Sequence, residues 1–134
     1  MSSEDAELDG NDDDLRDDEY TRSMYPLEER PFSQAWRRAV GAKYQYRTYF
    51  QRDHMRSRSY RGWPPKVALI KKQLDEMPSS DAIFLAAMVS FYNADTGGRL
   101  LRGLGVQGLS DIAANLDQER RELLAELLVN YIGW

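Results

Sequence analysis

The sequence contains no cysteine and only one histidine among its 134 residues. Without thiols the chain can form neither a disulfide framework nor a thiolate metal cluster, so a reducing compartment such as the cytoplasm is its expected location. No apolar run approaches the ~18 residues of a membrane-spanning helix. The first residues are acidic, whereas a signal or transit peptide starts with basic residues. We therefore expect a protein that does not insert into a membrane.

Side chains that support catalysis or metal binding are equally scarce. His54 lies in the segment QRDHMRSR, where arginines disfavour a bound cation, and a zinc site would need carboxylates from distant parts of the chain. No serine motif of the nucleophile-elbow type accompanies His54 and its neighbour Asp53. Adjacent acids such as Asp75 and Glu76 are typical of a solvated helix face. The sequence therefore predicts no enzymatic activity, no catalytic residue, no metal site and no cofactor.

Charge is divided unevenly along the chain. Residues 1–30 hold 12 acids and three bases, a net charge of −9, whereas residues 31–72 hold one acid and 11 bases, a net charge of +10. Residues 73–134 hold nine acids and four bases, a net charge of −5. The length of 134 residues is typical of a single domain. The net charge of the whole chain is only −4, and this value conceals a strongly basic segment between two acidic ones.

The acidic leader (residues 1–28) has few apolar side chains and no sustained periodicity. Chain entropy of about 1 to 2 kcal/mol per residue opposes its folding, and burial would not offset that entropy. We therefore predict that the leader is disordered. It could imitate a polyanion and shield a basic surface, or it could only raise the solubility of the protein.

Residues 31–134 are predicted to form a single all-α domain of four or five packed helices. The segment AIFLAAMVSFYN (82–93) is apolar around nearly its whole circumference, as expected of a central core helix. A helical period also places Leu127 on the apolar side of the last helix. We therefore expect Phe84, Phe91 and Leu127 to be buried.

The elements around this core helix are predicted from proline, glycine and capping residues. Asn93 and the pair Gly97–Gly98 should end the core helix, because left-handed C-cap positions favour these residues. The other predicted elements are a helix over 66–77, a glycine-containing connector over 99–108, a short helix from Ser110 and, after a break near Asp117, a longer helix to about Ile132.

Two short motifs match known patterns without the context that gives those patterns meaning. GxGxxG occurs at residues 103–108, yet a dinucleotide site places this loop between a strand and a helix, and a helix precedes it here. The segment SDIAANL (110–116) resembles the first helix of a helix-turn-helix, but Asp117 stands where the turn favours glycine. The helix after it would expose three glutamates to DNA, which is itself a polyanion. We therefore expect a packed helix hairpin and no nucleotide-binding loop.

The basic aromatic section (residues 31–72) is the feature with the clearest functional content. Arginine guanidinium groups suit phosphates, and exposed aromatic rings stack on unpaired bases with about 1 to 3 kcal/mol each. This composition predicts binding to a nucleic-acid backbone without sequence-specific readout. The candidate binding residues are Arg37, Arg38, Lys43, Arg47, Arg52, Arg56, Arg58, Arg61, Tyr49 and Tyr60.

The same composition is compatible with two other interpretations. The basic aromatic section could dock on an acidic protein surface, as an interaction or inhibitor protein does on a larger host assembly, or it could pair with the acidic leader of its own chain. Its local structure is also open, because KYQYRTYF (43–50) fits either a helix or an alternating strand. The helix is favoured, since no other segment offers a strand to pair with.

The second half of the chain resembles a known group of proteins. The stretch SSDAIFLAAMVSFYNADTGG is followed by a leucine-containing connector, an Asp-led helix and a terminal aromatic residue. In these features, residues 79–134 resemble an uncharacterised family of small helical accessory proteins from bacterial conjugative plasmids and integrative elements. The likeness implies bacterial cytoplasm and a mobile-element setting, but no activity and no functional residue. Small proteins of that setting often bind nucleic acid or disable host defence complexes.

Overall fold

The computed structural model describes residues 30–52 and 59–134. Across these ranges the chain forms α-helices and short 3-10 helices, with one isolated bridge between Phe50 and Pro65 and no strand. The predicted all-α class is therefore confirmed. The predicted disorder of the leader falls outside the described residues, as does His54. None of the described helices is long and apolar enough to cross a membrane.

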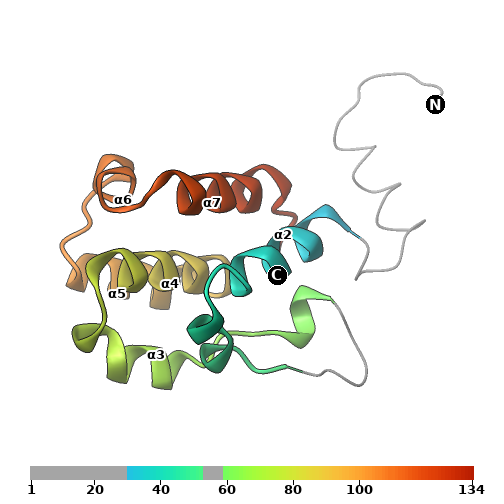
Figure 1. The fold of residues 1–134 in the computed structure, drawn as a ribbon, viewed down its shortest axis with the longest axis horizontal. Helices are drawn as coiled ribbons and strands as arrows, with labels where there is room; N and C mark the ends of the chain where they lie inside the picture. The colour runs from blue at the N-terminus through green and yellow to red at the C-terminus, as the bar shows by residue number, and fades with distance from the viewer. Residues whose placement is uncertain (1–29, 53–58) are drawn as a thin grey trace.

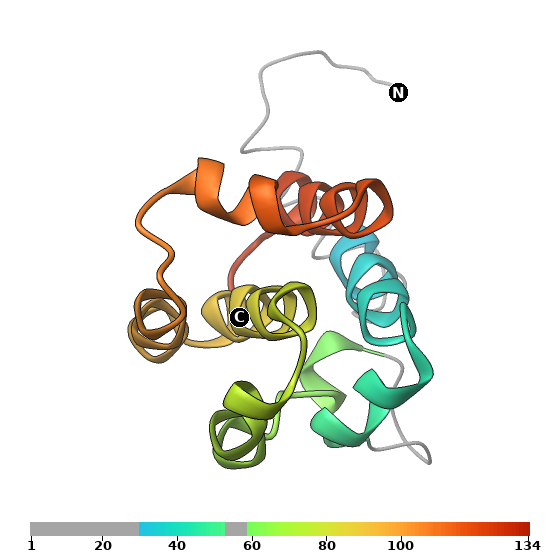
Figure 2. The ribbon, with the colours of Figure 1, turned by 60° about the vertical axis from the view of Figure 1, so that its left-hand side comes forward.

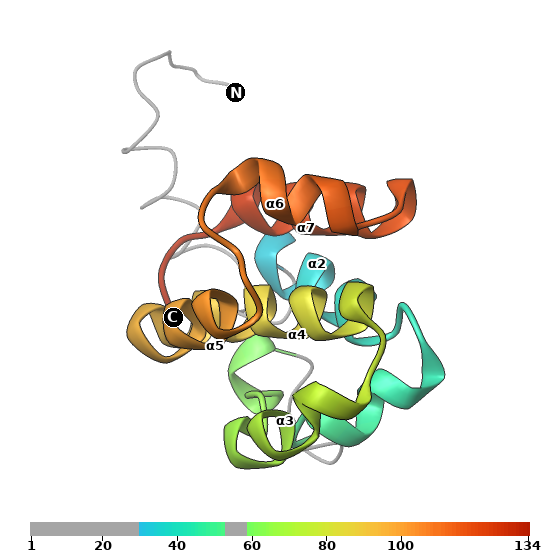
Figure 3. The same cartoon turned by 90° about the vertical axis from the view of Figure 1, so that its left-hand side faces the viewer.

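The helices pack in layers around α4 (Figures 1 and 2). Figure 3 shows α6 and α7 above the α4–α5 pair, with α3 below it. The elements in chain order, with 3-10 helices labelled η, are α2 (Pro31–Val40), η2 (Tyr44–Tyr49), η3 (Tyr60–Gly62), α3 (Val67–Gln73), η4 (Leu74–Glu76), α4 (Ser79–Tyr92), α5 (Ala94–Gly103), α6 (Leu109–Asn115) and α7 (Gln118–Asn130).

Helix α4 is the central core helix that its apolar circumference predicts. All nine residues from Asp81 to Val89 are buried. Phe84 and Leu127 are fully buried, as expected. Phe91 is only partly buried, because it lies near the end of α4, where its ring packs against Phe32 and Tyr131.

The start of the basic aromatic section differs from both structures that the sequence allows. Helix α2 ends at Val40, with Gly41 at its C-cap, so it does not continue through the tyrosines. Residues 44–49 then form the 3-10 helix η2, which is neither the favoured longer helix nor a strand. The short helix places Tyr46 inside the core and leaves Tyr44 outside it.

The prediction that Gly97 and Gly98 end the core helix is wrong. Helix α4 ends at Tyr92, and the Asn93 side chain accepts a hydrogen bond from the Thr96 N–H (3.0 Å), which caps a new helix at once. Both glycines lie inside this helix, α5, so the predicted connector over 99–108 is helical in its first half. Across the described ranges there are consequently six α-helices rather than four or five.

The close approach of α5 to α4 explains why Gly97 is a glycine. Gly97 is buried, and a Cβ atom at this position would lie 2.3 Å from the backbone N and Cα of Ser90 on α4. The two helices could not remain at this separation if residue 97 carried a side chain. This glycine therefore serves helix packing.

The predicted pair of helices at the end of the chain is confirmed, but the two do not pack on each other as a hairpin, because α6 packs against α4 and α7 packs mainly against α2. Helices α6 and α7 are separated by a break at Leu116 and Asp117, and the Asp117 carboxylate accepts a hydrogen bond from the Arg120 N–H (2.9 Å). Helix α6 starts at Leu109, where the Asp111 carboxylate accepts from the Gly108 N–H (3.1 Å). The helix dipole favours an acid in each of these first turns.

Candidate nucleic-acid interface

A buried polar network fixes η2 against the core. The Tyr46 side chain is 2% exposed, and its hydroxyl donates to Oδ1 of Asp81 (2.6 Å). Arg120 donates from Nε to the Tyr46 hydroxyl (2.8 Å) and from its terminal nitrogen to Oδ1 of Asp81 (2.8 Å). These three side chains join η2, α4 and α7. The network therefore holds η2, which carries part of the candidate interface, in one position.

Charges around Asp81 keep it ionised. Burial alone would raise the pKa of Asp81, but hydrogen bonds from Tyr46 and Lys43 and the charges of Lys43 and Arg120 outweigh burial and hold the pKa below its ordinary value. Burial, together with the hydrogen bond to Asp81, raises the pKa of the Tyr46 hydroxyl. Tyr46 is consequently a neutral donor to an ionised carboxylate.

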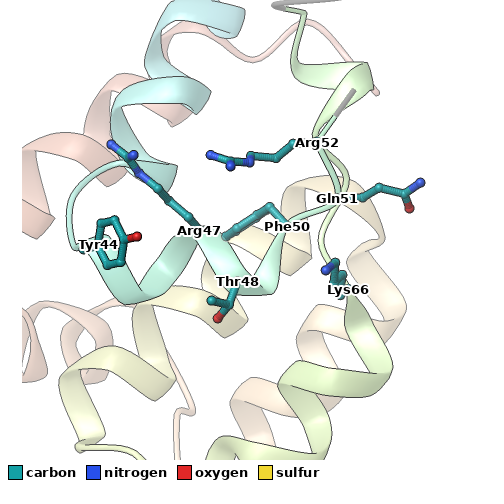
Figure 4. A pocket seen from close by; sticks show the side chains of 7 residues that line it. All are labelled: Tyr44, Arg47, Thr48, Phe50, Gln51, Arg52 and Lys66. Atoms are coloured by element: carbon teal, nitrogen blue, oxygen red, sulfur yellow. The ribbon is translucent and has the colours of Figure 1, made fainter. Parts of the chain in front are cut away.

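A hollow of about 490 Å³ lies beside η2 (Figure 4). Tyr44 and Arg47 lie on one side of the hollow in this view, Gln51 and Lys66 lie on the other, and Arg52 extends between them. The complete lining consists of Tyr44, Arg47, Thr48, Phe50, Gln51, Arg52 and Lys66.

Backbone pairing brings the two sides of this hollow together. Phe50 and Pro65 form the isolated bridge, the Gln51 N–H donates to the Pro64 carbonyl (2.9 Å), and the Lys66 N–H donates to the Tyr49 carbonyl (2.7 Å). Lys66 is thereby placed beside residues 14 to 22 positions earlier in the chain. A surface formed in this way could not be read from local spacing.

The hollow carries three positive charges and no acid in its lining. Arg47, Arg52 and Lys66 form no ion pair with any acid of the described ranges. The Arg47 guanidinium lies over the Tyr44 ring (5.6 Å to the centroid), and the Arg52 guanidinium lies over the Trp63 ring (5.7 Å). Like charges in a concave surface produce a positive potential, which attracts anions. The hollow therefore combines a positive surface with an aromatic edge.

Several predicted binding residues have partners inside the protein. Arg38 pairs with Glu126 (2.7 Å), and Lys43 pairs with Asp81 (3.0 Å). Arg61 donates from Nε to the Trp134 carbonyl (3.1 Å). These bases consequently contribute to packing and to the general potential, and none of them lines the hollow.

The two predicted tyrosines face inwards. Tyr60 is 1% exposed and donates from its hydroxyl to the Gly133 carbonyl (2.9 Å), so its ring is not available for stacking on a base. Tyr49 is partly buried and donates to Oε1 of Gln73 (2.6 Å). Both rings are core components, because a domain of this size uses most of its aromatics to fill its interior.

Only some of the predicted binding residues therefore line the hollow. It brings Arg47 and Arg52 together in the hollow and leaves Arg37 half-buried on α2. Arg56 and Arg58 lie outside the described residues. The lining adds residues that are not in the predicted set, namely Tyr44, Thr48, Phe50, Gln51 and Lys66.

The described ranges offer no cluster of metal-ligating side chains. They contain no group of three or more His, Cys, Asp or Glu residues that could hold a metal ion. The chain matches no protein-family model, no curated protein and no solved structure. The geometry of the hollow is thus the main guide to what this protein binds.

Proposed function

We propose that this protein is a non-enzymatic accessory protein that binds nucleic acid through its basic aromatic section without reading sequence. The observation that carries this proposal is the hollow beside η2, which Arg47, Arg52 and Lys66 line without an acidic partner among the described residues. Guanidinium and ammonium groups bind phosphate, which is the same in every nucleotide. Such contacts supply affinity and position but no sequence preference.

Charge reversal in the hollow tests this proposal. The double variant Arg47→Glu/Arg52→Glu should bind labelled oligonucleotides more weakly, and by a similar factor for every sequence. On a single strand, the slope of log affinity against log salt should become shallower by about 0.7 for each phosphate contact that is lost. Fluorescence anisotropy at several salt concentrations measures both quantities.

A matched control separates the hollow from the total charge of the protein. Arg102 is exposed on α5, which Figure 2 shows on the opposite side of α4 from η2. Arg102→Glu, together with Arg99→Glu on the same helix, gives the same total charge as the double variant and should retain most of the binding. Equal losses in both double variants, or unchanged binding in both, would contradict the proposed site.

The acidic leader is proposed to compete with nucleic acid for the basic aromatic section. Deleting residues 1–28 removes 11 acids and two bases. The deletion should tighten binding, and it should do so more at 0.01 M salt, where charges act over ~30 Å, than at physiological salt, where they act over ~8 Å. Titrations of both proteins at the two salt concentrations measure this difference. A truncated chain that binds no better than the full chain would leave the leader with a solubilising role only.

A second candidate function is docking on a protein partner, and exposed apolar side chains favour it. Val129 is 81% exposed and Leu128 is 60% exposed on α7, and Leu109 on α6 is 78% exposed. Such residues recur at protein interfaces. If this function is correct, a pull-down should retain the partner after nuclease treatment, and the variant Val129→Glu should no longer bind it. A partner lost with Arg47→Glu/Arg52→Glu and with nuclease would instead support nucleic-acid binding.

A further inference from the structure

Tyr44 differs from the other exposed aromatic residues of the described chain. It is 81% exposed, whereas Tyr92 is 38% exposed and packs against Trp134, and Tyr131 is 44% exposed and packs against Phe32 and Phe91. Burying apolar surface is favourable, so an aromatic ring left in water at the edge of a binding hollow is available for a ligand.

The backbone that carries Tyr44 is anchored although the ring is exposed. The Arg47 guanidinium covers one of its faces at 5.6 Å, and both residues belong to η2. Tyr46 anchors η2 through Asp81 and Arg120, and Lys43, directly before η2, also pairs with Asp81. An anchored backbone reduces the entropy that is lost when a ligand stacks on this ring.

The site has two components, and the cations of the hollow are the second, next to the Tyr44 ring. The hollow that Tyr44 borders contains the cations of Arg47, Arg52 and Lys66, and Gln51 and Thr48 supply polar groups to its lining (Figure 4). A ligand that fills both components must present a flat aromatic group and an anion on one short framework. A nucleotide has this chemistry, since its sugar joins an aromatic base to a phosphate.

The strandedness of the ligand follows from the same arrangement. In a duplex, each base is covered on both faces by its neighbours and is paired at its edge, so it offers no face to a tyrosine. In a single strand, a base can turn out and stack on an aromatic side chain, and arginine adds a cation–π contribution. A duplex could use the cations of the hollow but not the ring.

We propose that the hollow beside η2 is a single-strand site in which Tyr44 stacks one unpaired base and Arg47, Arg52 and Lys66 bind the adjoining phosphates. The inference rests on the proposed function, and it adds a ligand class and a residue that determines specificity. DNA and RNA single strands share this chemistry. We expect no preference among the bases, because every base has a π-face.

The test compares single strands with a duplex on the full chain. The probes are labelled 20-nucleotide dT and rU strands and a 20-base-pair DNA duplex, followed by anisotropy. Tyr44→Ala should weaken binding to one or both single strands by about 5- to 150-fold, which corresponds to one lost base stack, and should change duplex binding less than twofold. Tyr44→Phe retains the ring and should bind within about twofold of the parent protein.

A crosslinking experiment gives an independent readout. A single strand that carries 5-iodouracil should crosslink under ultraviolet light to the peptide containing Tyr44, and mass spectrometry should identify this residue. Crosslinks confined to other peptides would overturn the inference. Because Tyr44 lies outside the core, the thermal midpoint of Tyr44→Ala should equal that of the parent, so lost binding is not lost folding.

The outcomes separate this inference from the proposed function. If Tyr44→Ala binds single strands as well as the parent, or loses duplex and single strand equally, the single-strand site is wrong. If Arg47→Glu/Arg52→Glu still weakens binding in that case, nucleic-acid binding stands. If the parent protein binds none of the probes at low salt, both the function and the inference fall.

Discussion

Replacing Gly97 with alanine is expected to destabilise the protein by about 3 kcal/mol or more, a large part of the ~5 to 15 kcal/mol that holds a small domain together. In an exposed helix interior the same change is favourable by about 1 kcal/mol, because glycine is the poorer helix former. Here the added Cβ would lie 2.3 Å from the backbone of Ser90. Backbone atoms cannot rotate away, so α4 and α5 would have to separate, and overpacking of this severity exceeds the usual cost of 1 to 3 kcal/mol.

The neighbouring glycine provides the matched control. A Cβ at Gly98 would meet only the tip of the Arg102 side chain at 3.3 Å, and that flexible group can move. Gly98→Ala should therefore be neutral or more stable by up to about 1 kcal/mol. Urea unfolding followed by circular dichroism at 222 nm measures both variants. Similar midpoints for the two would mean that α5 does not approach α4 as closely as described.

Replacing Asp81 with alanine is expected to cost about 3 kcal/mol of stability, because the buried guanidinium of Arg120 loses the buried one of its two carboxylate partners and keeps only the exposed Asp117. Tyr46 loses its acceptor in the same substitution. The control is Asp95→Ala, since Asp95 is exposed and its ion pair with Arg99 lies within one helix. Such pairs contribute about 0.3 to 0.5 kcal/mol. Thermal and urea unfolding of the two variants should differ accordingly.

Acid titration checks the same network by a second route. The pKa of Asp81 is lower in the folded state than in the unfolded state, so its ionisation stabilises the fold at and above the ordinary carboxyl range near 4. This stabilisation is lost as pH falls through the lowered pKa. The parent protein should therefore lose stability below about pH 4, and Asp81→Asn should lose less over that range. Parallel acid profiles for the two proteins would contradict the role of Asp81.

Local periodicity was sufficient for the elements that lie within one stretch of chain. The apolar circumference of 82–93 correctly predicted α4, and the break at Asp117 correctly separated α6 from α7. The error at Gly97 has a physical reason. A glycine near a helix end looks the same in sequence whether it terminates one helix or allows another to approach, and only the partner at Ser90 distinguishes the two cases.

The sequence indicates which types of residue form the candidate site, but it does not show where in the fold they meet. Arg47 and Arg52 were recognisable as bases among aromatics, yet Lys66 joins them only because residues 50 and 65 pair. The sequence gives no reason to treat Tyr44 and Tyr60 differently. Tyr44 is nevertheless exposed and Tyr60 is buried, because η2 and η3 orient them differently. Likewise, Asp81 and Arg120 are 39 positions apart, so nothing local identifies them as partners.

The contacts around Tyr60 and Trp134 have a consequence for the order of folding. The Trp134 ring packs edge-on against Trp36 (5.0 Å) and Tyr60 (4.7 Å), which joins positions separated by up to 98 residues. Closing so long a loop costs entropy before any contact rewards it, whereas α4 and α5 adjoin in sequence and can pair early. We therefore expect the contacts of Trp134 with Trp36 and Tyr60 to form late in folding, after α4 and α5 have paired.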